Sequence, residues 1–181
     1  MKINIITLGC SKNLVDSEHL AGILKTNGHE VLFDSTKKKF EVAIINTCGF
    51  IGDAKEESID VILEYIEEKK KGNIGKIIVF GCLVERYKET LEEEFKAVDA
   101  FFGVNNYLDI ATYLNAKIEN DYFLQRQPST PKHFAYLKIS EGCDRFCSFC
   151  AIPYIRGRHI SIPIEELVAE AQCLAKRGVK E

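Results

Sequence analysis

The feature of this sequence that most restricts its fold is a regular alternation, over residues 1–118, of short apolar runs with stretches of helical periodicity. The apolar runs predict strands at Lys2–Leu8, Glu30–Phe33, Glu41–Asn46, Lys76–Phe80 and Ala100–Phe102. The stretches between them predict helices at Leu14–Asn27, Asp53–Lys71 and Leu83–Phe95, and a last helix, begun by Asn105 or Asn106, with Tyr107, Ile110, Leu114 and Ile118 on one face. Strands that alternate with helices form a parallel sheet covered on both faces. We therefore expect an α/β domain with a flavodoxin-like parallel sheet.

A second domain is predicted to begin after a short linker. Residues 119–133 contain two prolines close together and read as the linker. Residues 134–181 then predict a strand at Phe134–Ser140, a cysteine-rich loop, a helix that starts at Pro163, and the opening of a next strand at Val179–Glu181. The predicted apolar stripe of that helix comprises Ile164, Leu167, Val168, Ala171, Leu174 and Ala175. One βα unit cannot bury its own apolar face, so we expect the start of a larger β/α barrel and a chain that is part of a longer protein.

Composition indicates a protein of the cytosol. Hydrophobic residues make up 46% and charged residues 28% of the chain, and the net charge of −3 gives no sign of a nucleic-acid-binding surface. We find no signal-peptide pattern and no apolar run of the roughly 20 residues that a membrane span needs. We therefore expect a cytoplasmic protein with no membrane partner. In a reducing compartment its seven cysteines are not expected to form disulfides.

Three of these cysteines follow predicted strands at the same topological position. Cys10 comes after the first strand, Cys48 after Glu41–Asn46, and Cys82 after Lys76–Phe80, each with a neighbouring glycine. The carboxyl ends of parallel strands meet at one edge of the sheet, so the three thiols should converge there. Each cysteine alone would more often be a small buried hydrophobe, but the shared position favours a metal site. Three thiolates suit either zinc or an iron–sulfur cluster.

A second trio is packed into one loop, as Cys143-Asp-Arg-Phe-Cys147-Ser-Phe149-Cys150. This loop resembles the cluster loop of radical S-adenosylmethionine enzymes. The resemblance implies a four-iron cluster with three cysteine ligands, whose free iron chelates the amino and carboxylate groups of S-adenosylmethionine, with Phe149 packed near the adenine. The alternative is zinc with His159 as a fourth ligand, but zinc sites usually use paired knuckles, which this spacing fits poorly. The seventh cysteine, Cys173, lies about 180° around its helix from Ile164 and is expected to be a solvent-facing spare thiol.

Several motifs carry a resemblance to a known family. The loop Cys143-x3-Cys147-x2-Cys150 resembles that of radical S-adenosylmethionine enzymes, and both trios together resemble the methylthiotransferases among them. Shorter motifs resemble the branch of methylthiotransferases that modifies an aspartate of a ribosomal protein. These motifs are Leu8-Gly9-Cys10-Ser11-Lys12-Asn13 with Asp16-Ser17-Glu18, Asn46-Thr47-Cys48-Gly49-Phe50-Ile51, residues 135–143, Ile152-Pro153 and Arg156-Gly157-Arg158. The branch that modifies transfer RNA typically has Gln-Met-Asn after the first cysteine, where this chain has Ser-Lys-Asn.

The resemblance implies two 4Fe-4S clusters, an auxiliary one held by Cys10, Cys48 and Cys82 and a radical-generating one held by the second trio. It implies methylthiolation of the β-carbon of an aspartate in small-subunit ribosomal protein number twelve, with S-adenosyl-L-methionine as cosubstrate and flavodoxin or ferredoxin as electron donor. It also implies a division into residues 1–118, 119–133 and 134–181, the last being the start of a radical barrel. Two alternatives stay open: a transfer-RNA adenosine methylthiotransferase, and a non-catalytic zinc or iron–sulfur module.

Overall fold

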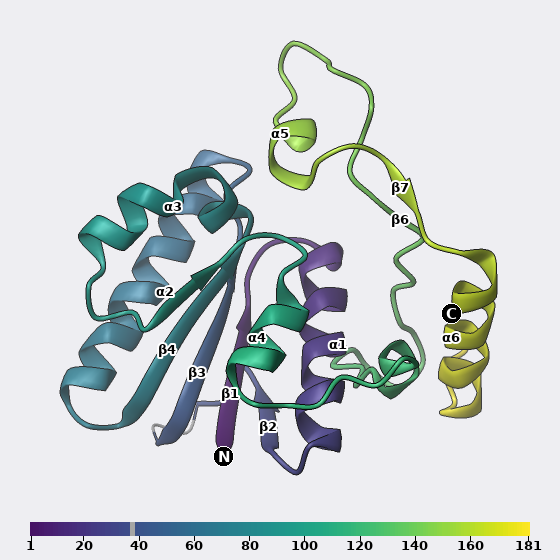
Figure 1. The fold of residues 1–181 in the computed structure, drawn as a ribbon, viewed down its shortest axis with the longest axis horizontal. Coiled ribbons are helices and arrows are strands. Elements are labelled where there is room, and N and C mark those ends of the chain that lie inside the picture. Colours follow the sequence, from purple (N-terminus) through teal and green to yellow (C-terminus); the bar gives the residue numbers. More distant parts are fainter. Residues whose placement is uncertain (37–38) are drawn as a thin grey trace.

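The computed structural model describes residues 1–36 and 39–181 and contains a five-stranded, wholly parallel sheet (Figure 1). Its strands are β1 (Lys2–Thr7), β2 (Glu30–Phe33), β3 (Phe40–Thr47), β4 (Ile74–Gly81) and β5 (Ala100–Phe102). Their spatial order is β2-β1-β3-β4-β5, and every neighbouring pair is parallel. This is the order of flavodoxin-like sheets, so the predicted fold of the first domain is confirmed.

Helices cover both faces of this sheet. On one face α1 (Ser11–Thr26) and α4 (Tyr107–Tyr113) pack on a core that includes Ile5 and Ile44. On the other face α2 (Gly52–Lys70) and α3 (Cys82–Glu94) pack on Ile6 and Ile45. Successive side chains of a strand point to opposite faces of the sheet. Neighbouring isoleucines of β1 and β3 therefore pack into different cores, one on each face. Because both faces are covered, the central strands carry continuous apolar runs.

The predicted helices are present, with shifted ends. The first begins at Ser11, earlier than the predicted Leu14, which makes Cys10 its N-cap residue. The last ends at Tyr113, and Asn115 has the positive φ of 60° that terminates it. Ile118 therefore lies outside the helix and is 37% exposed, so its predicted place on the buried face is wrong.

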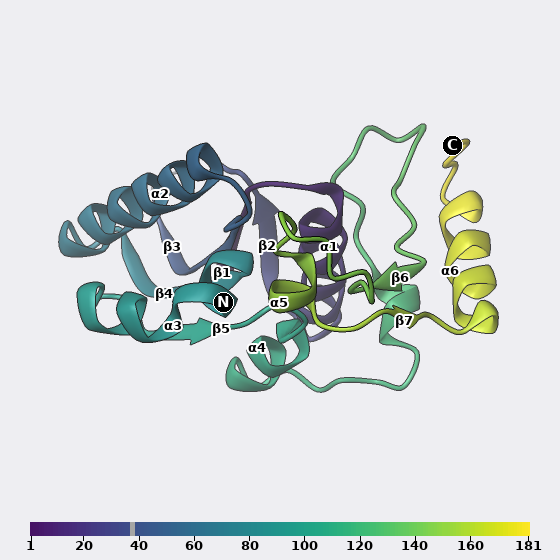
Figure 2. The ribbon, with the colours of Figure 1, turned by 90° about the horizontal axis from the view of Figure 1, so that it is seen from above.

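The chain after α4 folds back along α1 (Figures 1 and 2). It forms the 3₁₀ turn η1 (Tyr122–Gln125), the strands β6 (Ser140–Glu141) and β7 (Ile160–Ser161), and the helices α5 (Ile152–Arg156) and α6 (Ile164–Lys176). Strands β6 and β7 pair in antiparallel fashion. Helix α1 is consequently covered by the sheet on one side and by the returning chain on the other, which explains why its Asp16, Ser17, Glu18 and His19 are buried.

The predicted strand at Phe134–Ser140 is wrong except at Ser140. A strand needs a neighbour to bond its peptide groups, and few of these residues have one. The backbone of residues 133–135 does pair with the end of the chain. The Glu181 N–H donates to the His133 carbonyl at 3.0 Å, and the Ala135 N–H donates to the Glu181 carbonyl at 2.9 Å. This is the hydrogen-bond pattern of adjacent parallel strands, but no strand is assigned after α6 in the described residues, so the strand predicted at Val179–Glu181 stays a prediction.

Helix α6 turns its polar side, rather than its predicted apolar stripe, toward the first domain. Ile164 is 69% and Val168 50% exposed, whereas Glu170 is buried. Leu174 is the buried member of the predicted stripe. Within residues 1–36 and 39–181, no helix is long and apolar enough to cross a membrane.

Candidate metal centre

The first three cysteines lie at the carboxyl edge of three adjacent strands. Cys10 follows β1, Cys48 follows β3, and Cys82 follows β4 as the first residue of α3. Cys10 is exposed, and Cys48 and Cys82 are buried. The predicted placement of the three cysteines at one edge of the sheet is therefore confirmed, while their role as ligands stays a prediction.

Two glycines let the cysteine loops pack against each other. A Cβ on Gly9 would lie 2.7 Å from Cys48 Cβ, and one on Gly49 would lie 2.8 Å from the Cys82 carbonyl oxygen. Gly9 also has a φ of +89°, which other residues rarely adopt. The glycines beside Cys10 and Cys48 thus let the cysteine loops lie close together.

Buried polar side chains fix the strand ends that carry the cysteines. Asn13 Nδ2 donates to the carbonyls of Leu8 at 2.9 Å and Thr47 at 3.1 Å, and so ties the end of β1 to the end of β3. Ser58 Oγ accepts from the Cys48 N–H at 3.1 Å. Sequence reasoning assigned no role to Asn13 or Ser58, although Asn13 stands in the motif around Cys10.

The environment of Cys82 combines burial with a cation. Burial raises the pKa of the Cys82 thiol, the Arg156 guanidinium opposes that rise, and the nearby Cys48 and Cys10 thiols add to it. Arg156 Nη2 donates to Cys82 Sγ at 3.4 Å. Because metal ligands must be deprotonated, binding of a metal here would release protons.

The donor set of this site consists of thiols, which suit either zinc or an iron–sulfur cluster. In the described ranges 1–36 and 39–181, no three His, Cys, Asp or Glu side chains are arranged to hold one metal ion. A four-iron cluster presents a different iron to each thiolate, so its ligands stay farther apart than those of one zinc ion. Cys10, Cys48 and Cys82 would each ligate a different iron if they hold such a cluster.

The second trio lies on the loop between β6 and α5, above the same edge of the sheet (Figure 1). Cys143 and Cys150 are partly buried and Cys147 is exposed. The Cys150 N–H donates to the Cys147 carbonyl at 3.0 Å, and the Cys143 N–H donates to the Gly157 carbonyl at 3.1 Å, so the loop is closed at both ends. Phe149 is 91% exposed, and its contact with an adenine stays a prediction.

Two other residues named from the sequence have defined places. His159 Nε2 lies 3.2 Å from Ser161 Oγ, in the β7 strand. Cys173 was predicted to face solvent, and this is wrong: it is partly buried, and its thiol donates to the Leu124 carbonyl at 3.4 Å. The cause is the reversed orientation of α6, whose polar side packs on η1.

A network of charged residues joins the two cysteine regions around the Glu141 carboxylate. Arg156 Nη1 lies 2.9 Å from Glu141 Oε2, Lys138 Nζ lies 3.2 Å from the same oxygen, and Lys12 Nζ lies 3.3 Å from Oε1. Lys138 also pairs with Asp16 of α1. Burial alone would raise the pKa of Glu141, but Lys138 and Arg156 lower it to about 2. The loop that carries the second trio is thereby held to the helix that follows Cys10.

A second buried network holds the returning chain to α1. Arg126, 1% exposed, donates to Glu18 Oε2 at 2.6 Å and to Glu170 Oε1 at 2.6 Å. His19 Nε2 is 3.6 Å from Glu170 Oε1, but burial and the Arg126 charge lower the pKa of His19 to about 3, so the ring is neutral at pH 7 and this contact is no ion pair. Its Nδ1 is buried and has no hydrogen-bond partner among the residues that the structure describes.

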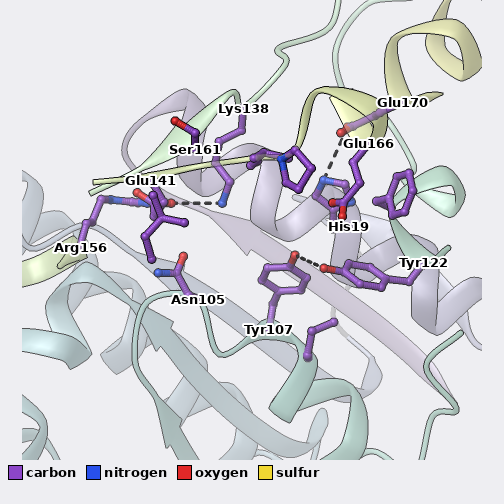
Figure 3. A pocket seen from close by; sticks show the side chains of 15 residues that line it. His19, Asn105, Tyr107, Tyr122, Lys138, Glu141, Arg156, Ser161, Glu166 and Glu170 are labelled. Carbon is purple, nitrogen blue, oxygen red and sulfur yellow. Dashed lines mark hydrogen bonds and ion pairs between the residues drawn. The ribbon is translucent and has the colours of Figure 1, made fainter. Parts of the chain in front are cut away.

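A pocket of about 400 Å³ lies between the two networks (Figure 3). Its lining includes His19 and Tyr107 from α1 and α4, and Tyr122, Lys138, Glu141 and Glu170 from the returning chain. The Tyr107 and Tyr122 hydroxyls are 3.4 Å apart. Because α1, α4 and the returning chain all contribute lining residues, the pocket exists only while the returning chain packs on these helices.

Comparison with known proteins gives relatives that match the whole chain. It is 55% identical over 179 residues to a protein of Bacteroides fragilis, 54% identical over 181 residues to one of Flavobacterium johnsoniae, and 49% identical over 180 residues to one of Porphyromonas gingivalis. Each is named "Ribosomal protein uS12 methylthiotransferase RimO", and each match covers 99% of this chain. The chain spans about 41% of the length of these curated relatives, 42% for the last.

The family assignment comes from a second comparison. A family model described as "Uncharacterized protein family UPF0004" matches residues 2–103, which include the five-stranded sheet and the first cysteine trio. Because the match covers more than half of the chain, this protein belongs to the UPF0004 family.

Proposed function

We propose that this chain is part of a radical S-adenosylmethionine enzyme that methylthiolates the β-carbon of an aspartate in ribosomal protein uS12. The observation that carries the proposal is the placement of two cysteine trios next to each other, one at the carboxyl edge of the sheet and one on the loop above it. The names of the relatives favour uS12 over transfer RNA as the substrate.

The two trios would hold two 4Fe-4S clusters. Cys10, Cys48 and Cys82 would ligate the auxiliary cluster, and Cys143, Cys147 and Cys150 the second cluster, with Phe149 beside the adenine of S-adenosyl-L-methionine. When bound, the second cluster supplies the electron that generates a 5′-deoxyadenosyl radical, and the auxiliary cluster supplies a place for the sulfur that is transferred.

The residues of the chain would position and shield these groups. Asn13 and Ser58 hold the loops of Cys10 and Cys48, and the Glu141 network holds the second loop beside them. Cys48 and Cys82 are buried, which keeps water from their side of the site.

The remaining parts of the proposal concern organisation and partners. Residues 1–118 would form the auxiliary-cluster domain, 119–133 a connecting segment and 134–181 the start of a radical barrel. The partners would be uS12 and a small electron donor such as flavodoxin or ferredoxin, and the place of action the cytoplasm.

Two measurements test the proposal. After anaerobic reconstitution with iron and sulfide, the broad visible absorption of iron–sulfur clusters is expected; a colourless protein that retains zinc would instead support a zinc module. The full-length protein should then convert an aspartate of uS12 to β-methylthioaspartate, detected by mass spectrometry of the digested substrate. Modification of a transfer RNA adenosine and not of uS12 would contradict the proposed substrate.

A further inference from the structure

Arg156 is a buried cation that connects the two cysteine trios. It ends α5, just after the loop of Cys143, Cys147 and Cys150, and is 6% exposed. Its Nη2 donates to Asn13 Oδ1 at 2.5 Å and to Cys82 Sγ at 3.4 Å. The guanidinium thus reaches from the second cysteine region into the first.

The other side of the guanidinium is already paired. Nη1 lies 2.9 Å from Glu141 Oε2 and 3.9 Å from Asp16 Oδ2, and Lys138 pairs with the same two carboxylates. Arg156 and Asp16 are buried, Lys138 and Glu141 are partly buried, and Lys12 Nζ also lies 3.3 Å from Glu141 Oε1. Both carboxylates are therefore already paired with cations. The Nη2 group instead faces an amide oxygen and a thiol, both neutral.

The fixed geometry of arginine gives Nη2 a definite target. A guanidinium is planar, and its N–H groups point in set directions. The bonds to Glu141 and Asn13 fix that plane from two sides, and Nη2 is then held beside Cys82 Sγ. A charged donor bonds more strongly to an ionised acceptor, so this arrangement is better suited to a thiolate that ligates a metal than to a thiol.

We infer that Arg156 is a positioning residue for the auxiliary cluster: it donates a hydrogen bond from the second cysteine region to the Cys82 sulfur and thereby raises the cluster's reduction potential. The inference rests on the proposed function, in which Cys82 is a cluster ligand. Hydrogen bonds to ligating sulfurs and nearby positive charge favour the reduced, more negative cluster. The potential of one cluster would consequently depend on the docking of the loop that carries the other.

The test isolates the auxiliary cluster in a Cys147→Ala background of this chain. Reduction potentials are measured by redox titration monitored by electron paramagnetic resonance, with Arg156→Gln and Arg156→Lys added in turn. For Arg156→Gln we expect reduction to become about tenfold less favourable, which is about 59 mV for a one-electron couple. Arg156→Lys keeps the positive charge but loses the planar set of guanidinium N–H donors. It should therefore lower the reduction potential by less than Arg156→Gln does.

Arg158→Gln is the matched control. It removes the same charge from the same segment, but the Arg158 side chain is exposed. We expect the equilibrium for reduction to change less than twofold. An equal change in Arg156→Gln and Arg158→Gln would show that net charge alone acts, and would overturn the inference.

A second readout needs no substitution of Arg156. Protein labelled with ¹⁵N in its arginine guanidinium groups should show a nitrogen coupling to the reduced auxiliary cluster in pulsed electron paramagnetic resonance. The coupling should persist in Arg158→Gln. Its absence when Arg156 is intact would overturn the inference even if Arg156→Gln fails to fold. If the Cys147→Ala protein binds no four-iron cluster at all, the ligand assignment in the proposed function fails instead.

Discussion

His19 should make the stability of this protein fall as the pH is lowered from 7 to 5. The ring lies on α1 under the returning chain, 5% exposed, and stacks on Tyr107 with the ring centroids 6.0 Å apart. Burial and the charges of Arg126 and Lys138 lower its pKa from 6.5 to about 3. The folded protein therefore keeps His19 neutral at pH 5, whereas the unfolded chain protonates it.

The sign and size of the effect follow from linkage. Because the folded pKa is the lower one and the charged form is the protonated one, the stabilisation is present above pH 6.5 and is lost as the pH falls toward 3. Each pH unit between the two pKa values costs about 1.4 kcal/mol. Between pH 7 and pH 5 the free energy of unfolding should drop by about 2 kcal/mol from this residue alone.

Urea unfolding of the apo-protein at pH 7 and pH 5 measures this loss. His19→Gln should lower stability at pH 7, since the ring packing is lost, but the additional drop at pH 5 should shrink by about 2 kcal/mol. His133→Gln, at an exposed position, is the control and should leave the drop in place. If His19→Gln showed the same drop as the unsubstituted protein, the reasoning about the buried ring would be refuted.

Three further predictions concern the returning chain. Glu18→Gln should lower the free energy of unfolding by about 3–5 kcal/mol, because Arg126 loses the charge of one of its two buried partners; urea unfolding measures this, and the exposed Glu56→Gln should change little. Amide exchange should be fast in Leu167–Leu174 and slow in Ile77–Phe80, since α6 leaves most of its apolar stripe exposed; equal protection would reveal a partner for that stripe. The 181-residue chain should form no β-methylthioaspartate from uS12 even with both clusters loaded, and mass spectrometric detection of that product would contradict this.

The first domain could be predicted well because its signals are local. Runs such as Ile77–Phe80 are apolar and β-branched, so they identify buried strands from the sequence alone. The start of α1 was missed because its N-cap residue, Cys10, is not one of the residue types that mark helix starts. In the described part of the chain its side chain also makes no capping hydrogen bond. The placement of the cysteines at one edge of the sheet followed from the order of strands and helices.

The arrangement of the returning chain could not be predicted, because it depends on pairs distant in sequence. Nothing local marks Arg126 as the buried partner of Glu18, and the linker-like sequence around it suggested exposure. Cys173 was misplaced because the apolar stripe of α6 was taken as its packed side, while the buried ion pair of Glu170 turns the polar side inward. The hydrogen bond from Arg156 to Cys82 also joins residues distant in sequence, so it could not be predicted either.

The central claim is that the cysteines form two separate cluster sites, and iron content tests it most directly. Anaerobically reconstituted protein should hold about eight irons, as two four-iron clusters. Cys48→Ala and Cys147→Ala should each lose about half of that iron, the double variant nearly all, and Cys173→Ala none. Equal iron loss in Cys48→Ala, Cys147→Ala and Cys173→Ala would contradict the assignment.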